Sequence, residues 1–155
     1  MEEIITEFTP PEEIKKWKGF FPDGRKLRIL VVPANDGGCA YYRAWSPYRK
    51  LEELYPNVVD ITFEKNPLGM DLSAGNMPEG ETEIMKWADV IVINNISNFG
   101  GPYTARICGI AKQLGKFVHT DTDDLLTDLY EGHRLKEVYK DRGLSDITKH
   151  VYQHS

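Results

Sequence analysis

Residues 26–38 read KLRILVVPANDGG and carry the clearest fold signal in the sequence. From Leu27 to Val32 it is nearly all apolar and rich in β-branched side chains, and Pro33 ends the run, which is typical of a central parallel strand buried on both faces. A loop with two glycines, Gly37 and Gly38, follows before helical spacing begins. Strand, glycine loop and helix together predict the first half of a βαβ unit.

The helical segment 39–55 carries an aromatic face. Its apolar side chains recur at Tyr41, Trp45, Tyr48, Leu51 and Tyr55. We expect the first two of these to lie in the core, and Pro47 predicts a kink or a restart of the helix. Tyr42 and Arg43 point elsewhere, so they are candidates to reach a ligand, with the guanidinium as a fork for phosphate or carboxylate.

Strand and helix patterns alternate along the rest of the chain. Further strands are expected at 58–64, 89–94 and 116–120, and further helices at 81–88 and 102–114. This alternation predicts an α/β fold: a Rossmann-like, doubly wound, mainly parallel sheet of four or more strands with helices on both faces.

The domain organisation follows from the same patterns. A capping box at Thr9 predicts a short helix ending at Gly19, so residues 1–25 are interpreted as an N-terminal helical extension. Residues 26–155 are interpreted as one Rossmann-like domain whose last 30 residues are helical. Four strands are few for this fold, and we therefore interpret the chain as a fragment of a longer two-domain enzyme.

Composition excludes several classes of protein. The 155 residues are 41% hydrophobic and 28% charged, and 19 basic against 24 acidic residues give a net charge of −5. No basic cluster suggests nucleic-acid binding, and no apolar run is long enough to span a membrane. With acids where a signal peptide needs bases, the chain is expected in the cytoplasm, and Cys39 and Cys108 are expected to be buried free thiols.

Two loops and one acidic cluster are candidates for function. The long segment 66–80 and the polar segment 94–101, which contains Asn95, are expected beside a cleft. The run 119–124 reads HTDTDD directly after a strand, where α/β sheets bind ligands. It could hold Mg²⁺, supply a base or a binder of sugar hydroxyls through His119 or Asp121, or cap the following helix.

The glycine loop has two interpretations as well. Glycines let a backbone approach an anion, and the amino end of a helix offers free N–H groups to a phosphate. The loop lacks the third glycine of a dinucleotide fingerprint and the Gly-Lys-Ser/Thr of a P-loop, so Gly37 and Gly38 could equally serve a tight turn.

Taken together, these motifs resemble the amino-terminal domain of GT-B glycosyltransferases, most closely the family 4-like group. The resemblance covers about residues 26–155, and the order and spacing of the motifs carry it. The motifs are Gly37-Gly38-Cys39, Tyr41-Tyr42-Arg43 with Pro47, Trp87-Ala88-Asp89-Val90, Gly115-Lys116-Phe117-Val118 and Asp121-Thr122-Asp123-Asp124-Leu125.

The resemblance implies a two-domain enzyme with a cleft between two Rossmann-like halves. This half would bind the acceptor, which is a glycan, a lipid or a small molecule, and a C-terminal domain absent from the sequence would grip the nucleotide-sugar. The expected roles are donor phosphate binding for Gly37, Gly38 and Arg43, catalysis for His119 and Asp121, and lining of the acceptor cleft for Tyr42, Asn95 and Asp123. No metal or other cofactor is expected to be required, although Mg²⁺ is possible.

Two rival functions remain open at this point. One is a stand-alone flavodoxin-like module that binds a nucleotide or phospho-ligand without catalysis. The other is a small Mg²⁺-dependent phosphotransfer or hydrolase domain built on Asp121, Asp123 and Asp124. If the last helices normally pack on a missing half, their apolar faces would favour a homo-oligomer of the isolated chain.

Overall fold

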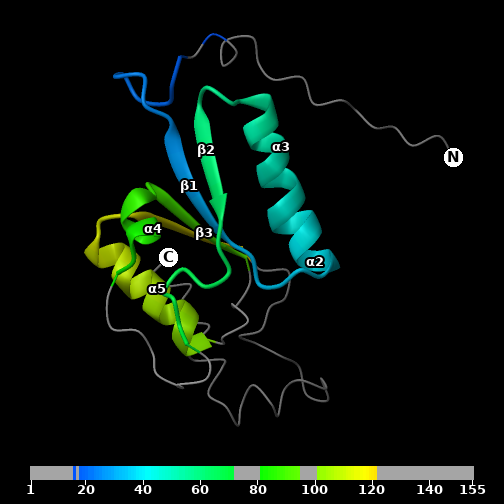
Figure 1. The fold of residues 1–155 in the computed structure, drawn as a ribbon, viewed down its shortest axis with the longest axis vertical. Coiled ribbons are helices and arrows are strands. Elements are labelled where there is room, and N and C mark those ends of the chain that lie inside the picture. The colour runs from blue at the N-terminus through cyan, green and yellow to red at the C-terminus, as the bar shows by residue number, and fades with distance from the viewer. Residues whose placement is uncertain (1–15, 17, 72–80, 95–100, 122–155) are drawn as a thin grey trace, which may run out of the picture.

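The computed structural model describes residues 16, 18–71, 81–94 and 101–121. These residues form a four-stranded, all-parallel sheet in the order β2-β1-β3-β4 (Figure 1). The strands are β1 (Leu27–Val32), β2 (Val59–Phe63), β3 (Val90–Asn94) and β4 (Phe117–Asp121). The predicted α/β fold is confirmed, and each strand begins and ends within one residue of its expected bounds.

Helices lie on both faces of the sheet (Figure 1). One face carries α2 (Gly38–Ala40), the π-helical turn η1 (Tyr41–Trp45) and α3 (Ser46–Leu54); the other carries α4 (Glu83–Trp87) and α5 (Gly101–Gln113). The side chains of β1 alternate between the layers, because Leu30 and Val32 pack toward α5 while Ile29 and Val31 pack toward α3.

The connections determine where a ligand can bind. From β1 the chain crosses to β2 on one side, and from β3 it crosses to β4 on the other, so the topological switch point lies between β1 and β3. In sheets of this kind the crevice beyond the carboxyl ends of the strands at the switch point is the usual ligand site.

The turn before β4 is set by a glycine. Gly115 has φ +66, and its N–H bonds to the carbonyl of Lys112 while the N–H of Lys116 bonds to the carbonyl of Ala111. These two bonds make a Schellman motif, which ends α5 and directs the chain into β4.

The helix after the glycine loop differs from the prediction. The N–H of Ser46 bonds to the carbonyl of Tyr41, five residues back, so η1 is wider than an α-helical turn. The restart expected at Pro47 is present, but the expectation that Tyr41 lies in the core is wrong: it is 50% exposed, and Ala44 is fully buried instead. The wider turn inserts one residue and rotates the preceding side chains about the helix axis.

The expectations for the cysteines, the long loop and the terminal helices have different outcomes. Cys108 is buried as expected, whereas Cys39 is exposed. Of the long loop 66–80, residues 66–71 pack on the α5 side, since Leu68 belongs to that core. The helices expected at the two ends of the chain lie outside the described residues.

No helix in the described part of the chain has the length and apolarity needed to cross a membrane.

Candidate functional site

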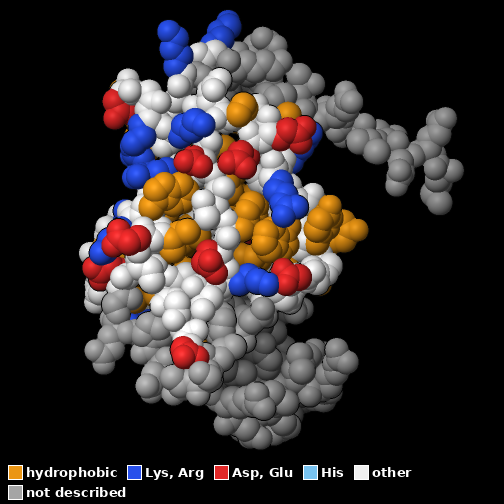
Figure 2. All heavy atoms as spheres, in the orientation of Figure 1, with side chains coloured by type: hydrophobic (Ala, Val, Ile, Leu, Met, Phe, Trp, Pro, Cys, Tyr) orange, Lys and Arg blue, Asp and Glu red, His pale blue; other side chains and the backbone are white. Residues whose placement is uncertain are grey.

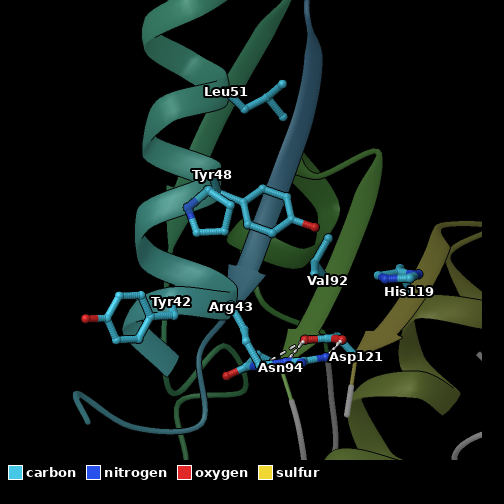
Figure 3. Close-up of a pocket in the computed structure, with 9 residues that line it drawn as sticks. Tyr42, Arg43, Tyr48, Leu51, Val92, Asn94, His119 and Asp121 are labelled. Carbon is cyan, nitrogen blue, oxygen red and sulfur yellow. Dashed lines mark hydrogen bonds and ion pairs between the residues drawn. The ribbon is translucent and has the colours of Figure 1, made fainter. Parts of the chain in front are cut away.

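A pocket of about 520 Å³ lies between α3 and the exposed side of β3 and β4 (Figure 3). Side chains of α3 form one wall, and the strands form the floor near their carboxyl ends. Its volume is in the range of small-molecule sites. The lining residues are Tyr42, Arg43, Pro47, Tyr48, Leu51, Val92, Asn94, His119 and Asp121.

Asp121 is held in place by two neighbours. The parallel register sets Asn94 opposite Asp121, and the amide Nδ2 of Asn94 donates to Oδ2 of Asp121 over 3.3 Å. Arg43 Nε donates to the same Oδ2 over 2.8 Å, and Arg43 Nη2 donates to Oδ1. Hydrogen bonds and charge from Arg43 lower the pKa of Asp121, against a smaller effect of burial. Asp121 is therefore a carboxylate that accepts hydrogen bonds and is a poor proton donor.

Asn94 is the buried polar group of the site. It is 4% exposed, and within the described part of the chain the bond to Asp121 is the only side-chain hydrogen bond that it makes. Its Oδ1 and its second amide hydrogen therefore have no partner among the described residues, although buried amides normally satisfy most of their bonding capacity. A ligand hydroxyl that both donates and accepts would satisfy these atoms.

Tyr48 adds a second polar group on the opposite wall. Its ring points from α3 across the pocket (Figure 3), and burial, followed by the charge of Asp121, raises the pKa of its phenol. The phenol therefore keeps its proton at neutral pH and can donate to a ligand.

The π-helical turn positions the residues at the rim. Tyr42 is 76% exposed and packs edge-to-face on Tyr41, with the ring centroids 5.4 Å apart. Arg43, the next residue, reaches back over the pocket to Asp121 (Figure 3). Wide turns of this kind are frequent at functional sites.

His119 completes the polar set. It lies two residues before Asp121 on β4, so both side chains are on the same side of the strand. Its ring is exposed and lines the pocket from the β4 side (Figure 3).

The structure brings together four of the predicted site residues: Tyr42, Arg43, His119 and Asp121. Gly37 and Gly38 begin the helix but do not line the pocket, and the N–H of Gly37 donates to Oδ1 of Asn35 over 2.7 Å. Asn95 and Asp123 lie outside the described residues, as does Asp124.

Sequence reasoning missed five lining residues. Pro47, Tyr48 and Leu51 were treated as helix punctuation or core, and Val92 as strand. Asn94 was expected in the polar segment 94–101 beside a cleft, but it was given no role in the site. Asn94 carried a usable signal, because it is a polar residue at the carboxyl end of an otherwise apolar strand.

Two observations bear on the expected chemistries without testing them, because Asp123 and Asp124 of the Mg²⁺ alternative lie outside the described residues. The guanidinium of Arg43, expected to bind the donor phosphate, pairs with the carboxylate of Asp121 in this structure. Within the described residues, no three His, Cys, Asp or Glu side chains come together in a way that could hold a metal ion.

Comparison with known proteins gives no family for this chain. It matches no protein-family model, no curated protein and no solved structure.

Proposed function

We propose that this chain is the acceptor-binding half of a GT-B-type glycosyltransferase, which transfers a sugar from a nucleotide-sugar to an acceptor hydroxyl. The observation that carries the proposal is the arrangement of Asn94 and Asp121 at the carboxyl ends of β3 and β4: an ionised carboxylate beside a buried amide whose remaining polar atoms have no partner among the described residues. These are groups that bind and orient a hydroxyl.

The charges around the pocket favour a neutral ligand at this position. Arg43 and Asp121 neutralise each other as a bidentate pair, so neither is available to hold a separate charge without breaking that pair. The neutral phenol of Tyr48 supplies a donor on the other wall. A polyhydroxylated acceptor fits this set better than a phosphate does.

In the proposed reaction, Asp121 and Asn94 orient the acceptor hydroxyl and the imidazole of His119 takes its proton. The acceptor oxygen forms a bond to the anomeric carbon of the donor sugar as the bond from that carbon to the diphosphate oxygen breaks. The nucleoside diphosphate leaves with the bonding electron pair. The enzyme contributes positioning, a base and an environment for the developing charge.

The test uses the product of the parent gene, expressed from its own start codon to its own stop codon. It is assayed for sugar transfer from a panel of nucleotide-sugars, and then as the variants His119→Gln and Asp121→Asn. We expect each variant to lower the transfer rate by about a hundredfold or more, since a positioned base contributes that much. Phe117→Tyr, on the same strand but outside the pocket, is the matched control. Transfer by both variants at the wild-type rate would overturn the proposal.

The glycine loop is tested separately in the same protein. A Cβ at Gly38 meets no atom within 4 Å, and its backbone needs no positive φ, so a bulky residue there should leave the fold intact. If Gly38 faces the donor diphosphate, Gly38→Trp lowers transfer and raises the KM for the donor without lowering the unfolding temperature. An unchanged KM would remove the loop from the mechanism.

One observation favours the rival function, a flavodoxin-like binding module without catalysis. In the order β2-β1-β3-β4 the third strand lies beside β1, as in the flavodoxin-like order, whereas in the classic Rossmann order it lies beside β2. Binding of a nucleotide by the full-length product without any transfer would favour that function.

A further inference from the structure

A second, apolar hollow of about 660 Å³ lies along α3. Its walls include Leu27 and Ile29 of β1, Leu54 of α3, and Val58 and Val59 at the start of β2, with Phe20 at one end. Among the described residues, Lys50 is the one charged residue in its lining. Figure 2 shows one side of the molecule, on which hydrophobic side chains gather across the middle with charged side chains above and below.

This hollow is open to solvent, and core residues form part of its lining. Ile29, Val58 and Val59 are each less than 9% exposed, although they line it. No residue of α3 is fully buried, even though the helix packs on the sheet through Tyr48, Leu51 and Leu54. The flank of α3 and the neighbouring residues of β1 and β2 therefore form an apolar hollow that is open to a ligand.

The hollow is continuous with the candidate site. Pro47 and Leu51 line both spaces, so the two form one groove along the same flank of α3. At one end are the polar groups of Asn94, His119 and Asp121; at the other are only aliphatic and aromatic walls and the side chain of Lys50. The groove thus changes from polar to apolar over the length of one short helix.

We infer that the acceptor is an amphiphile: a hydroxylated head group at Asn94 and Asp121, carrying a hydrocarbon chain that lies in the apolar hollow. This inference rests on the proposed function and specifies its acceptor. The polarity gradient selects the occupant, because a fully polar acceptor would leave the hollow unfilled and a fully apolar one would leave Asn94 unsatisfied.

Alkyl glucosides of increasing chain length test the inference on the full 155-residue chain without any donor. Binding of methyl, hexyl and octyl β-D-glucopyranoside is measured by titration calorimetry below the micellar concentration of each. Burial of a methylene strengthens binding by up to about fourfold, so we expect the octyl glucoside to bind at least ten times more tightly than the methyl glucoside.

Two variants test where the hydrocarbon chain of the glucoside binds. Leu54→Trp fills the hollow from α3 and should abolish the dependence on chain length while leaving binding of methyl glucoside unchanged. Phe117→Trp, which adds the same indole at an exposed position outside both spaces, should leave the chain-length dependence intact. Circular dichroism checks that both variants fold.

The outcomes separate the two proposals. Equal affinity for methyl and octyl glucoside, or an unchanged dependence in Leu54→Trp, would overturn the inference and leave the proposed function standing. Binding of neither glucoside would overturn the inference, whereas the proposed function is decided by the transfer assay of the full-length product. A concentration-dependent dimer that Leu54→Trp dissociates would assign the hollow to a second copy of the chain, and that result also overturns the inference.

Discussion

Asp121 accepts hydrogen bonds from residues 27 and 78 positions away in the chain. The contact with Asn94 follows from strand register, and the contact with Arg43 follows from the helix after β1. Of the three aspartates in the acidic run, Asp121 is the one that the structure describes, and these two contacts hold its carboxylate in place. Arg43 is the main cause of the lowered pKa of Asp121, so a substitution of Arg43 should change that pKa measurably.

Removing the guanidinium should raise the pKa of Asp121. Arg43 lowers that pKa, so in Arg43→Gln the carboxyl should titrate at a higher pH than in the wild type. Carbon-13 NMR of the side-chain carboxyl measures the shift directly. Lys86→Gln, which removes a cation from α4 on the other face, should leave the titration of Asp121 unchanged. An unchanged pKa in Arg43→Gln would show that the pair is not formed in solution.

Asp89 lies at the amino end of β3, at the opposite end of the sheet from the candidate site. Burial alone would raise its pKa, but hydrogen bonds from the Arg25 side chain and from the backbone and side chain of Arg28 outweigh burial and hold the pKa at about 2, below the ordinary 3.8. A carboxyl with a lowered folded pKa stabilises the fold above its unfolded pKa and loses that contribution as the pH falls. The contribution at neutral pH is on the order of 2 kcal/mol.

The pH dependence of unfolding tests whether the ionised carboxylate of Asp89 stabilises the fold. Between about pH 4 and pH 2 the wild type should lose stability more steeply than Asp89→Asn, and the two should converge at the acid end. Urea unfolding at a series of pH values measures both. Glu53→Gln, at an exposed carboxylate on α3, should follow the wild-type curve. Parallel curves for the wild type and Asp89→Asn would contradict the assignment.

At the scale of elements, η1 is the feature that the hydrophobic spacing did not reveal. Period 3.6 sets Tyr41 on the same face as Tyr48, and that reasoning holds only while every turn is α-helical. Pro47 lacks the N–H that would bond to the carbonyl of Arg43, and the wide turn precedes it directly. Pro47 predicted an irregular helix, but the sequence did not show that the turn before it would be π-helical.

Paired substitutions distinguish a π-helical from an α-helical turn. Ala44 is fully buried in the structure, so Ala44→Leu should overpack the core and lower the free energy of unfolding by about 1 to 3 kcal/mol. Tyr41→Ala, at an exposed position, should change it by less than about 1 kcal/mol. Urea unfolding measures both variants. A regular α-helix with Tyr41 in the core predicts a large loss for Tyr41→Ala, and that result would contradict the turn.

For the whole molecule, the sheet was predictable because its strands are buried. Parallel strands buried on both faces leave unambiguous apolar runs, and the four expected strands match the observed ones closely. His119 and Asp121 lie at the carboxyl end of β4, where the sequence predicted them, and line the pocket there. Tyr48 was missed because its place in the site depends on helix packing. Asn94 was expected beside a cleft, but its contact with Asp121 depends on strand register, which local sequence patterns do not encode.

The two faces of the sheet are covered unequally among the described residues. On the α5 side the core reaches β4 through Val118, whereas on the α3 side Phe117 is 66% exposed and His119 is exposed. This open side of β4 borders the candidate site. The accessible residues of the site and the apolar hollow therefore lie on the same side of the sheet.

An NMR titration of the nitrogen-15-labelled chain with octyl β-D-glucopyranoside, in wild type and in Asn94→Ala, tests whether Asn94 binds the ligand. We expect the side-chain amide of Asn94 and the backbone amides of His119 and Asp121 to shift first and saturate together, and Asn94→Ala to weaken binding at least tenfold. Shifts confined to the α5 side, or equal affinity in wild type and Asn94→Ala, would contradict binding at Asn94.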